Sequence, residues 1–389
     1  MLQHRCSKVG VLLAALLTSQ LSLLSLLSAC TPEPPLYLFD GGEISIRFPL
    51  VSVELDSYWD YGPDYDWRTE WYYGWDDEDR RLFGEIGYTE PTIFAMRRYY
   101  TGDVAKGPHQ YVLSNTVDGS SFMGKYRWGM WDILVWNDIH TIDGVQSLNF
   151  DETSLEYVMA YTNQTMHTAR YHAPRYVHSF YQPEPLFAAY EQGIDINRDL
   201  RGFEYDPVQD LYIKRLNMTL EPITYIYLPQ IILHHNRNKI AGIDGMANLS
   251  GMARTTTLNT CTSGDDPVTV NYSSRLKYNC NKQGETVDII GGRLMTFGIC
   301  GQNANRVKSQ ADVVDANRPF LDMTMLFNNG MDSTFVFDVT DQVRRRYKGG
   351  VITVELDMDT IRVPSRSGGS AFNAIVKDFE DGGTHEFGL

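Results

Sequence analysis

The stretch MTMLFNNGMDSTFVFDV, residues 323–339, places an apolar run on each side of Asn328-Asn329-Gly330. Asn and Gly accept the positive φ angles that a tight turn requires, so this pattern predicts an antiparallel β-hairpin. Residues 339–347, directly after the hairpin, predict one or two helical turns that end at Lys348-Gly349-Gly350. The hairpin therefore indicates a β-sheet in the second half of the chain, with little helix beside it.

Short strand candidates continue on both sides of the hairpin. In the second half they are residues 211–220, 223–234, 255–258, 268–272, 286–290, 351–357 and 361–363. In the first half an alternating strand starts at Glu43, and further candidates are 82–88, 91–100, 111–116, 131–136 and 154–161. Asp118-Gly119 predicts a turn, and residues 183–190 predict a short helix. Two series of short strands without long helices predict an all-β (mainly) fold of two β-sandwiches in tandem.

The N-terminus has the pattern of an exported protein. Arg5 and Lys8 precede an almost wholly apolar run from Val9 to Ala29, which predicts a secretory signal peptide over residues 1–29. The ending Leu27-Ser28-Ala29-Cys30 resembles the lipobox of bacterial lipoproteins, in which the Cys becomes the lipidated N-terminus. A plain transmembrane anchor is the alternative, because about 20 apolar residues can span a bilayer. We expect lipidation of Cys30, and thus a lipid anchor in the outer membrane.

The remaining chain divides into a tether and two domains. Residues 30–42 contain Thr31-Pro-Glu-Pro-Pro35 and predict a stiff lipidated tether, since prolines favour extended chain. The polar, turn-rich stretch 195–210 marks a boundary. We therefore predict an N-terminal β-sandwich over residues 43–200 and a C-terminal β-sandwich over residues 201–389.

Charge excludes one class of partner. The full chain carries a formal net charge of −15, and removal of a signal with two basic residues changes this to −17. Nucleic-acid binding needs clustered Lys and Arg, so no nucleic-acid partner is expected. The membrane contact is predicted to be made through the lipid alone.

Motifs that would carry catalysis or metal binding are missing from the sequence. His167, His172 and His178 are spaced by five and six residues, which matches neither a strand face nor a helix face. The run Asp195-Ile-Asn197-Arg-Asp199 begins like a calcium loop, but Leu200 stands where that loop needs Gly. No nucleophile elbow, zinc-protease motif or phosphate loop occurs. We predict a non-catalytic protein without metal or cofactor; a β-rich hydrolase would need a deep pocket with convergent carboxylates.

Residues 57–81 interleave aromatic and acidic side chains. Its four tryptophans are Trp59, Trp67, Trp71 and Trp75. Trp rings beside carboxylates have the composition of a glycan-binding surface, and they equally suit aromatic packing on a β-sheet. Both interpretations stay open here, with packing favoured. Cys261, Cys280 and Cys300 are the cysteines beyond the lipid site, and an odd number allows at most one disulfide among them.

Several short sequences resemble known proteins. The words EWYYGW (70–75), FGEIGYT (83–89), WDILVWN (131–137) and DGVQSL (143–148) resemble an uncharacterised family of Bacteroides lipoproteins. The words LSGMA (249–253), FDVTDQ (337–342) and VITVE (351–355) are similar to fimbrillin-like proteins of Bacteroidales, which form major and minor fimbria (pilus) subunits.

The resemblance implies two transthyretin-like (Greek-key) sandwiches and a cell-surface role in adhesion. Shaft fimbrillins are cut at an Arg in the first domain, which removes a strand and opens a groove for a neighbour's strand. Arg47, Arg68, Arg80 and Arg81 do not match that cleavage context, so a fimbria anchor or accessory subunit is the role implied. The partners implied are other fimbria-like surface lipoproteins, joined by β-strand addition. Host or dietary glycans are the alternative partners.

Overall fold

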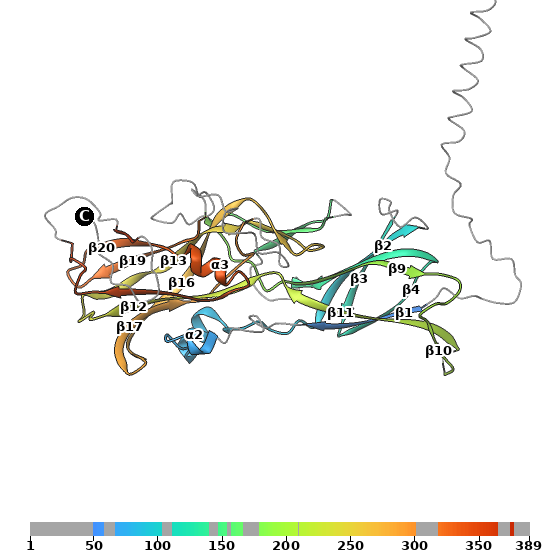
Figure 1. The fold of residues 1–389 in the computed structure, drawn as a ribbon, viewed down its shortest axis with the longest axis horizontal. Helices are drawn as coiled ribbons and strands as arrows, with labels where there is room; N and C mark the ends of the chain where they lie inside the picture. The colour runs from blue at the N-terminus through green and yellow to red at the C-terminus, as the bar shows by residue number, and fades with distance from the viewer. Residues whose placement is uncertain are drawn as a thin grey trace, which may run out of the picture. The chain divides into compact units, whose positions relative to one another are not determined.

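The structure is a computed structural model. Its first described element is strand β1 (Leu50–Ser57). The described residues are 50–57, 67–102, 111–139, 147–153, 157–165, 179–208, 210–300, 318–364 and 374–376. The predicted strand at Glu43 lies outside them. The described chain is mainly β, as the sequence predicts, and forms three sheets with short helices (Figure 1).

The first sheet has eight strands in the order β3-β2-β5-β9-β11-β1-β4, with β10 paired to β11. Besides β1 these are β2 (Ile93–Gly102), β3 (Tyr111–Asp118), β4 (Ser121–Lys125), β5 (Gly129–Asn137), β9 (Phe187–Ile196), β10 (Glu204–Asp206) and β11 (Leu211–Pro222).

The two ends of this sheet meet. β3 and β4 stand at opposite ends of the strand order, yet only Gly119 and Ser120 separate them in the chain. Gly119 has a φ of 84°, a left-handed conformation that favours glycine, so the predicted turn is confirmed. The Gly119 N–H donates to the Thr92 carbonyl at 2.8 Å, and the Leu55 N–H donates to the Ser120 carbonyl at 2.7 Å. The sheet therefore curls around one apolar core, whose members include Val53, Met96, Trp131, Ile133 and Phe187.

The second sheet has ten strands in the order β18-β12-β17-β16-β13-β19-β20-β22, with β21 paired to β12 and β8 paired to β16. The strands are β8 (Ser179–Phe180), β12 (Tyr225–His234), β13 (Ile240–Ala253), β16 (Pro267–Lys282), β17 (Glu285–Gly292), β18 (Leu294–Thr296), β19 (Phe320–Phe327), β20 (Asp332–Asp338), β21 (Gly350–Asp357) and β22 (Ala374–Val376). The predicted hairpin is confirmed: β19 and β20 pair antiparallel, and Gly330 has a φ of 79° at the turn.

The third sheet combines distant parts of the chain. Its order is β15-β14-β7-β6, with β6 (Leu148–Asp151), β7 (Met159–Thr162), β14 (Thr255–Thr257) and β15 (Thr262–Ser263). A core beneath it contains Trp136 of the first sheet, Ala160 of the third and Ala253 of the second. Residues 48–389 accordingly form one compact unit, and the division at residue 200 stays a prediction.

Helices are few and short in the part of the chain that the structure describes. They are the 3-10 turn η1 (Trp67–Thr69), α2 (Asp77–Phe83) and α3 (Thr340–Arg345), which confirms the helical turn predicted within 339–347. Among the described residues, none of the helices has the length and apolar character needed to cross a membrane.

Three local predictions were wrong. Residues 183–190 do not form a helix but lead into β9, because Phe187 and Ala188 enter different apolar cores on the two faces of a strand. Residues 82–88 are not a strand: α2 ends at Phe83, and its N-terminus is fixed by a capping box between Asp76 and Asp79. Residues 361–363 follow a turn that closes β21 and form no strand.

A polar row crosses the second sheet. Asp322 of β19 lies in register with Asn248 of β13, and Asn248 with Asn271 of β16. The amide of Asn271 donates to Asn248, and the amide of Asn248 donates to Asp322. Asp322 is only 4% exposed, and burial raises its pKa to about 7 although the Asn248 hydrogen bond opposes the rise. In the folded protein this carboxyl group is therefore mostly neutral below about pH 7.

Asp322→Asn should therefore change how stability depends on pH. The unfolded carboxyl loses its proton near pH 4 and the folded one only near pH 7. The folded state thus binds the extra proton, so this group's contribution falls as pH rises from about 4 to about 7. The full shift corresponds to roughly 4 kcal/mol. We expect the free energy of unfolding of the variant not to fall over this pH range. At pH 8 it should exceed that of the wild type by about 1–3 kcal/mol, a figure that includes the cost of an unpaired amide donor. Denaturant unfolding at pH 4.5, 6 and 8 measures the free energy of unfolding of both proteins. The exposed Asp332→Asn serves as control, and an unchanged pH slope in Asp322→Asn would contradict the account.

Candidate functional site

Strand β1 lies within the first sheet, between β11 and β4 (Figure 1). It pairs in parallel with β11 over all eight of its residues, from Leu50 opposite Ile213 to Ser57 opposite Leu220. Its other side pairs antiparallel with β4, from Leu50 to Glu54. We call this position between β11 and β4 the β1 site. A strand of the same alternating pattern from another chain would fit its hydrogen-bonding edges.

The side chains of β1 alternate as the β1 site requires. Val51, Val53 and Leu55 are buried in the core of the first sheet, whereas Glu54 and Asp56 are exposed. Successive side chains of a strand point to opposite faces, so every second residue enters the core. Three aliphatic side chains are therefore the whole apolar contribution of these positions to the core.

The chain that follows β1 docks on the second sheet through residues 67–88, here called the docked segment. Trp67, Trp71 and Tyr73 share an apolar core with the strands beneath them. The buried residues supplied by the second sheet are Ile226, Leu228, Ile232, Val287, Ile289, Met295 and Val351. The docked segment leads on to β2, so a connection within the first sheet is packed against the second.

Gln230 of β12 fixes the backbone of the docked segment. Its side chain is fully buried, and its Oε1 accepts hydrogen bonds from the Tyr72 and Tyr73 N–H groups at 3.0 and 3.2 Å. Its Nε2 donates to the Glu70 carbonyl at 2.7 Å and to the Thr353 hydroxyl at 3.0 Å. Buried backbone groups outside a sheet need such partners, because an unsatisfied one costs about 1–3 kcal/mol. The amide of Gln230 thus stands in for the neighbouring strand that the docked segment lacks.

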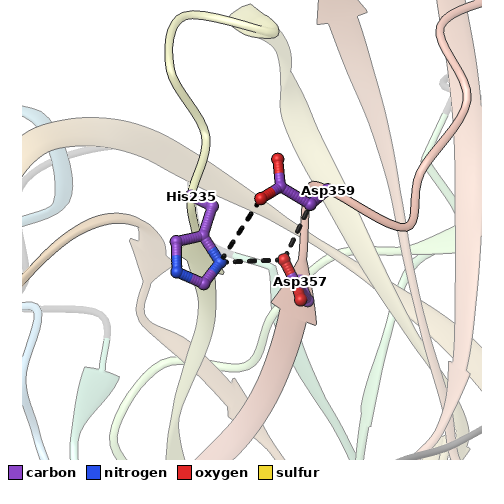
Figure 2. A group of neighbouring side chains, drawn as sticks. All are labelled: His235, Asp357 and Asp359. Atoms are coloured by element: carbon purple, nitrogen blue, oxygen red, sulfur yellow. Dashed lines mark hydrogen bonds and ion pairs between the residues drawn. The ribbon is translucent and has the colours of Figure 1, made fainter.

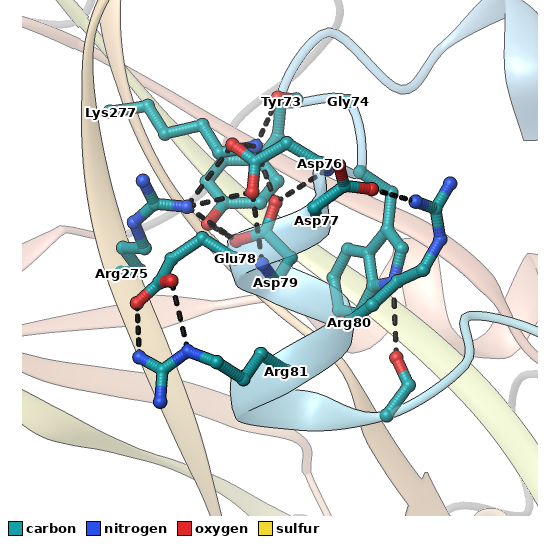
Figure 3. Close-up of polar contacts among 12 residues, drawn as sticks. Tyr73, Gly74, Asp76, Asp77, Glu78, Asp79, Arg80, Arg81, Arg275 and Lys277 are labelled. Carbon is teal, nitrogen blue, oxygen red and sulfur yellow. Dashed lines mark hydrogen bonds and ion pairs between the residues drawn. The ribbon is translucent and has the colours of Figure 1, made fainter.

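An ion-pair cluster holds the far part of the docked segment to β16 (Figure 3). Asp79, whose side chain has no exposed surface, pairs with Lys277 at 2.5 Å and with Arg275 at 3.1 Å. The Tyr73 hydroxyl donates to Asp79 at 2.8 Å, and the Lys277 ammonium lies 4.0 Å from the centre of the Tyr73 ring. Two cations and a phenol therefore surround one buried carboxylate, which is the condition under which a buried charge is tolerated.

The same cluster shifts the pKa values of Tyr73 and Asp76. Burial and the hydrogen bond to Asp79 raise the pKa of Tyr73 well above its usual range, so the hydroxyl stays a donor. Burial opposes ionisation of Asp76, but the backbone N–H of Asp79 together with Lys277 and Arg275 holds its pKa well below the usual range. At neutral pH the Tyr73 hydroxyl therefore stays protonated and the Asp76 carboxylate stays ionised.

The outer edge of β21 is closed by Gln342 of α3 and by Arg346, the residue that follows α3. Gln342 Nε2 donates to the Thr353 carbonyl at 2.8 Å, and the Thr353 N–H donates to Gln342 Oε1 at 2.9 Å. Arg346 donates to the Val351 carbonyl and also to the Glu70 carboxylate of the docked segment. Pairing of another chain to this edge is thereby blocked.

The edge of β20 is covered differently. β22, close to the end of the chain, pairs in parallel with β20 at Phe335, Val336 and Phe337. β20 extends from Asp332 to Asp338, so β22 covers only part of that edge. This edge is a further place, among the described strands, where a strand from elsewhere could pair.

Of the four tryptophans that the sequence groups as a glycan surface, the structure describes Trp67, Trp71 and Trp75. Trp67 and Trp71 are each 8% exposed and belong to the core under the docked segment. Their ring faces are taken up by packing, which corrects their assignment to an exposed platform. Trp75 is partly buried against that core, and its indole N–H donates to the Gly84 carbonyl at 3.1 Å. Trp59 lies outside the described residues, as does Cys30.

The arginines weighed as cleavage positions are bound in place where the structure describes them. Arg80 and Arg81 pair with Asp77 and Glu78 on α2, and the Arg68 guanidinium lies 4.9 Å from the centre of the Trp67 ring. All three follow β1 in the chain. Arg47 precedes β1 and lies outside the described residues.

A histidine–carboxylate cluster sits at the ends of β12 and β21 (Figure 2). His235 Nδ1 lies 3.0 Å from Asp357 Oδ1 and 4.0 Å from Asp359 Oδ2, and all three residues are exposed. The hydrogen bond to Asp357 raises the pKa of His235. Arg237 lies 3.3 Å from Asp359 and Lys239 lies 3.9 Å from it, so two cations already compensate this carboxylate. We interpret the group as a surface ion-pair cluster.

The three cysteines beyond the lipid site are free thiols. Burial raises the pKa of Cys261 to about 11 and that of Cys300 to about 12. Thiols with such values carry almost no thiolate at neutral pH and react slowly. They serve as packing groups.

No protein-family model matches the chain, and no curated protein matches its sequence. The solved structures that the chain resembles include a candidate adhesin from Bacteroides ovatus, at 12% identity and a TM-score of 0.46, over 80% of this chain and 93% of that one. The fimbrial anchor protein Mfa2 from Porphyromonas gingivalis matches at 10% identity and a TM-score of 0.36, over 79% and 90%. The tip fimbrial protein Mfa3 from the same organism matches at 8% identity and a TM-score of 0.32, over 74% and 81%.

The chain thus has the structural similarity to adhesin and fimbrial proteins of Bacteroidales that its sequence words predict, at low sequence identity.

Gln230→Leu tests the anchoring of the docked segment. The variant keeps an apolar contact but leaves the Tyr72 and Tyr73 N–H groups and the Glu70 carbonyl without their partner. At about 1–3 kcal/mol for each buried group, we expect the free energy of unfolding to fall by roughly 3–6 kcal/mol. Denaturant unfolding is the measurement. Gln283→Ala is the matched control, because this exposed Gln also contacts the segment, at the Tyr72 hydroxyl, and should change stability by no more than about 0.5 kcal/mol. Equal effects of the two variants would contradict the role of Gln230.

Proposed function

We propose that the protein is a cell-surface lipoprotein with a structural or adhesive role, acting as a fimbria anchor or accessory subunit. It would be held in the outer membrane by lipid on Cys30 and joined to other surface subunits by β-strand addition. In this proposal the two tandem transthyretin-like β-sandwiches of the predicted fold form its body, with the boundary near residue 200. The role is non-catalytic and uses no cofactor.

The observation that carries the proposal is the β1 site. β1 is bound by hydrogen bonds along both edges, as a strand supplied by another subunit would be. Its three buried side chains are each worth about 1.5–3 kcal/mol of burial, which a second strand with the same pattern would restore. Exchange at this position would therefore be close to neutral in free energy once a partner strand is present.

The docked segment supports separability of β1. Residues 67–88 are fixed to the second sheet by Gln230 and by the Asp79 cluster, independently of β1. If β1 left its site, the chain would still be held from Trp67 onwards. The loss would be confined to one strand, which strand addition requires.

The lipobox, the arginines of the first half and the edge of β20 fit an anchor or accessory subunit better than a shaft subunit. The lipobox at Cys30 supports attachment to a membrane, and the arginines in the first half lack the cleavage context of shaft subunits. The partly covered edge of β20 supplies a second position for a partner strand. Glycan binding through residues 57–81 is the weaker alternative, since two of its rings are buried.

A disulfide that locks β1 in place tests the proposal. Glu54 of β1 and Ser121 of β4 are opposite one another in register and both exposed, so Glu54→Cys with Ser121→Cys can form a cross-strand disulfide. We expect the wild-type protein, extracted from outer membranes in mild detergent, to run as a heat-labile ladder that contains other surface lipoproteins. The oxidised double variant should run as a monomer, and reductant should restore the ladder.

The matched control places the same disulfide elsewhere. Leu326 and Asp332 are an exposed register pair of β19 and β20, and Leu326→Cys with Asp332→Cys should leave the ladder intact. A wild-type protein that is a clean monomer would contradict strand addition altogether. A ladder that persists in the locked variant would contradict the assignment to the β1 site.

A further inference from the structure

A cavity of about 440 Å³ lies away from the β1 site, over the first half of β16. Its volume falls in the range of small-molecule sites, roughly 300–1,000 Å³. It is lined by Ser147, Asn163, Thr165, Phe180, Tyr181, Gln182, Glu184, Met246, Asn271, Tyr272 and Ser273.

Short strand pairings build one wall of the cavity. The Thr165 N–H donates to the Ser179 carbonyl at 2.7 Å, and the Tyr181 N–H donates to the Asn163 carbonyl at 3.1 Å. β8 then pairs in parallel with β16, which places Phe180 opposite Val270. Backbone pairing therefore fixes Asn163 and Tyr181 relative to the floor formed by β16.

Hydrogen bonds also hold the polar lining in place. Gln182 Nε2 donates to the Asn271 carbonyl at 3.2 Å, and Gln182 Oε1 accepts from the Met295 N–H at 3.0 Å. Glu184 accepts from the Ser147 and Leu148 N–H groups at 2.6 and 2.9 Å, and from the Ser147 hydroxyl at 2.9 Å. These side chains are preorganised before any ligand arrives.

The charges of the lining limit the class of ligand. No Lys, Arg or His is among the described residues that line the cavity, so an anionic ligand would find no counter-ion there. Glu184 is the single carboxylate, and both of its oxygens are already engaged by Ser147 and Leu148. A cationic ligand would have to share the oxygens of this one carboxylate with Ser147 and Leu148. A neutral ligand is the class that the lining suits.

Two side chains of the lining keep hydrogen-bonding capacity. Within the described part of the chain, the amide of Asn163 and the hydroxyl of Tyr181 have no hydrogen-bond partner. Asn163 offers donors and an acceptor, and the ring of Tyr181, 44% exposed, adds apolar surface. Amides beside an aromatic ring match a molecule with hydroxyl groups on a carbon ring.

We propose that this cavity is a binding site for a neutral polyhydroxylated ligand, a sugar unit of a glycan. Asn163 and Tyr181 bind its hydroxyl groups, and the apolar lining of Phe180, Tyr272 and Met246 contacts its carbon skeleton. The site differs from the tryptophan surface of residues 57–81 and does not depend on strand addition. It would give a surface protein a recognition function separate from its assembly.

Titration calorimetry and saturation-transfer NMR on the full lipidated protein, in a detergent without sugar headgroups, test the site. The probes are galactose, mannose, N-acetylglucosamine and lactose, with glucuronate and glucosamine as charged counterparts. We expect saturable binding of at least one neutral sugar and about tenfold weaker binding of the charged ones. Asn163→Ala and Tyr181→Phe should each weaken binding of the neutral sugar about five- to tenfold, because each variant loses one hydrogen bond to it.

Tyr205→Ala, which removes a 51% exposed Tyr elsewhere, is the matched control and should bind as the wild type does. Tyr181→Phe keeps the ring and its packing, so a loss of binding there reports the hydroxyl and not misfolding. Absence of saturable binding by every neutral sugar would overturn the proposal. Binding of the charged sugars with equal affinity, or binding that neither Asn163→Ala nor Tyr181→Phe alters, would overturn it as well.

Discussion

The buried amide of Gln230 is the contact on which the arrangement of the chain depends. It satisfies three backbone groups of the docked segment at once, and without it Trp67, Trp71 and Tyr73 would have to pack beside unpaired polar groups. Because the docked segment connects β1 to β2, this one side chain couples a connection of the first sheet to the face of the second. The Asp79 cluster holds the same segment further along, with charge where Gln230 uses neutral hydrogen bonds.

Because of this coupling, the docked segment stays fixed when β1 separates from its site. From Trp67 onwards the chain is held by two independent sets of contacts, whereas β1 contributes three core side chains and its backbone pairings. The edges of β21 and β20 likewise divide into one that is protected and one that is open. β21 is closed by Gln342 and Arg346, while β20 is covered only in part by β22. Of these three positions, the β1 site and the edge of β20 are open to strand addition, whereas the outer edge of β21 is protected.

Local patterns in the sequence predicted the mainly β fold, most strand positions, the turn at Gly119 and the hairpin at Gly330, since these depend on neighbours in the chain. The third sheet could not be predicted, because β7 and β14 pair across about a hundred residues. The strand at Phe187 escaped prediction since burial on both faces, not propensity, decides it. Gln230 carried a weak signal, a polar side chain in the middle of the mostly apolar run YIYLPQIILH, and only the structure supplies its partners. Aromatic composition could not distinguish the buried rings of Trp67 and Trp71 from an exposed surface.

Native-state hydrogen exchange, followed by mass spectrometry on the full chain, tests most directly whether β1 is separable from a fixed docked segment. The account predicts that the amides of Val51 and Val53 exchange through a local opening of lower free energy. The amides of Tyr72 and Tyr73 should exchange only with those of β12, at the free energy of global unfolding. Exchange of β1 and β12 as one unit would contradict a separable β1. Exchange of Tyr72 and Tyr73 ahead of both strands would contradict the anchoring by Gln230.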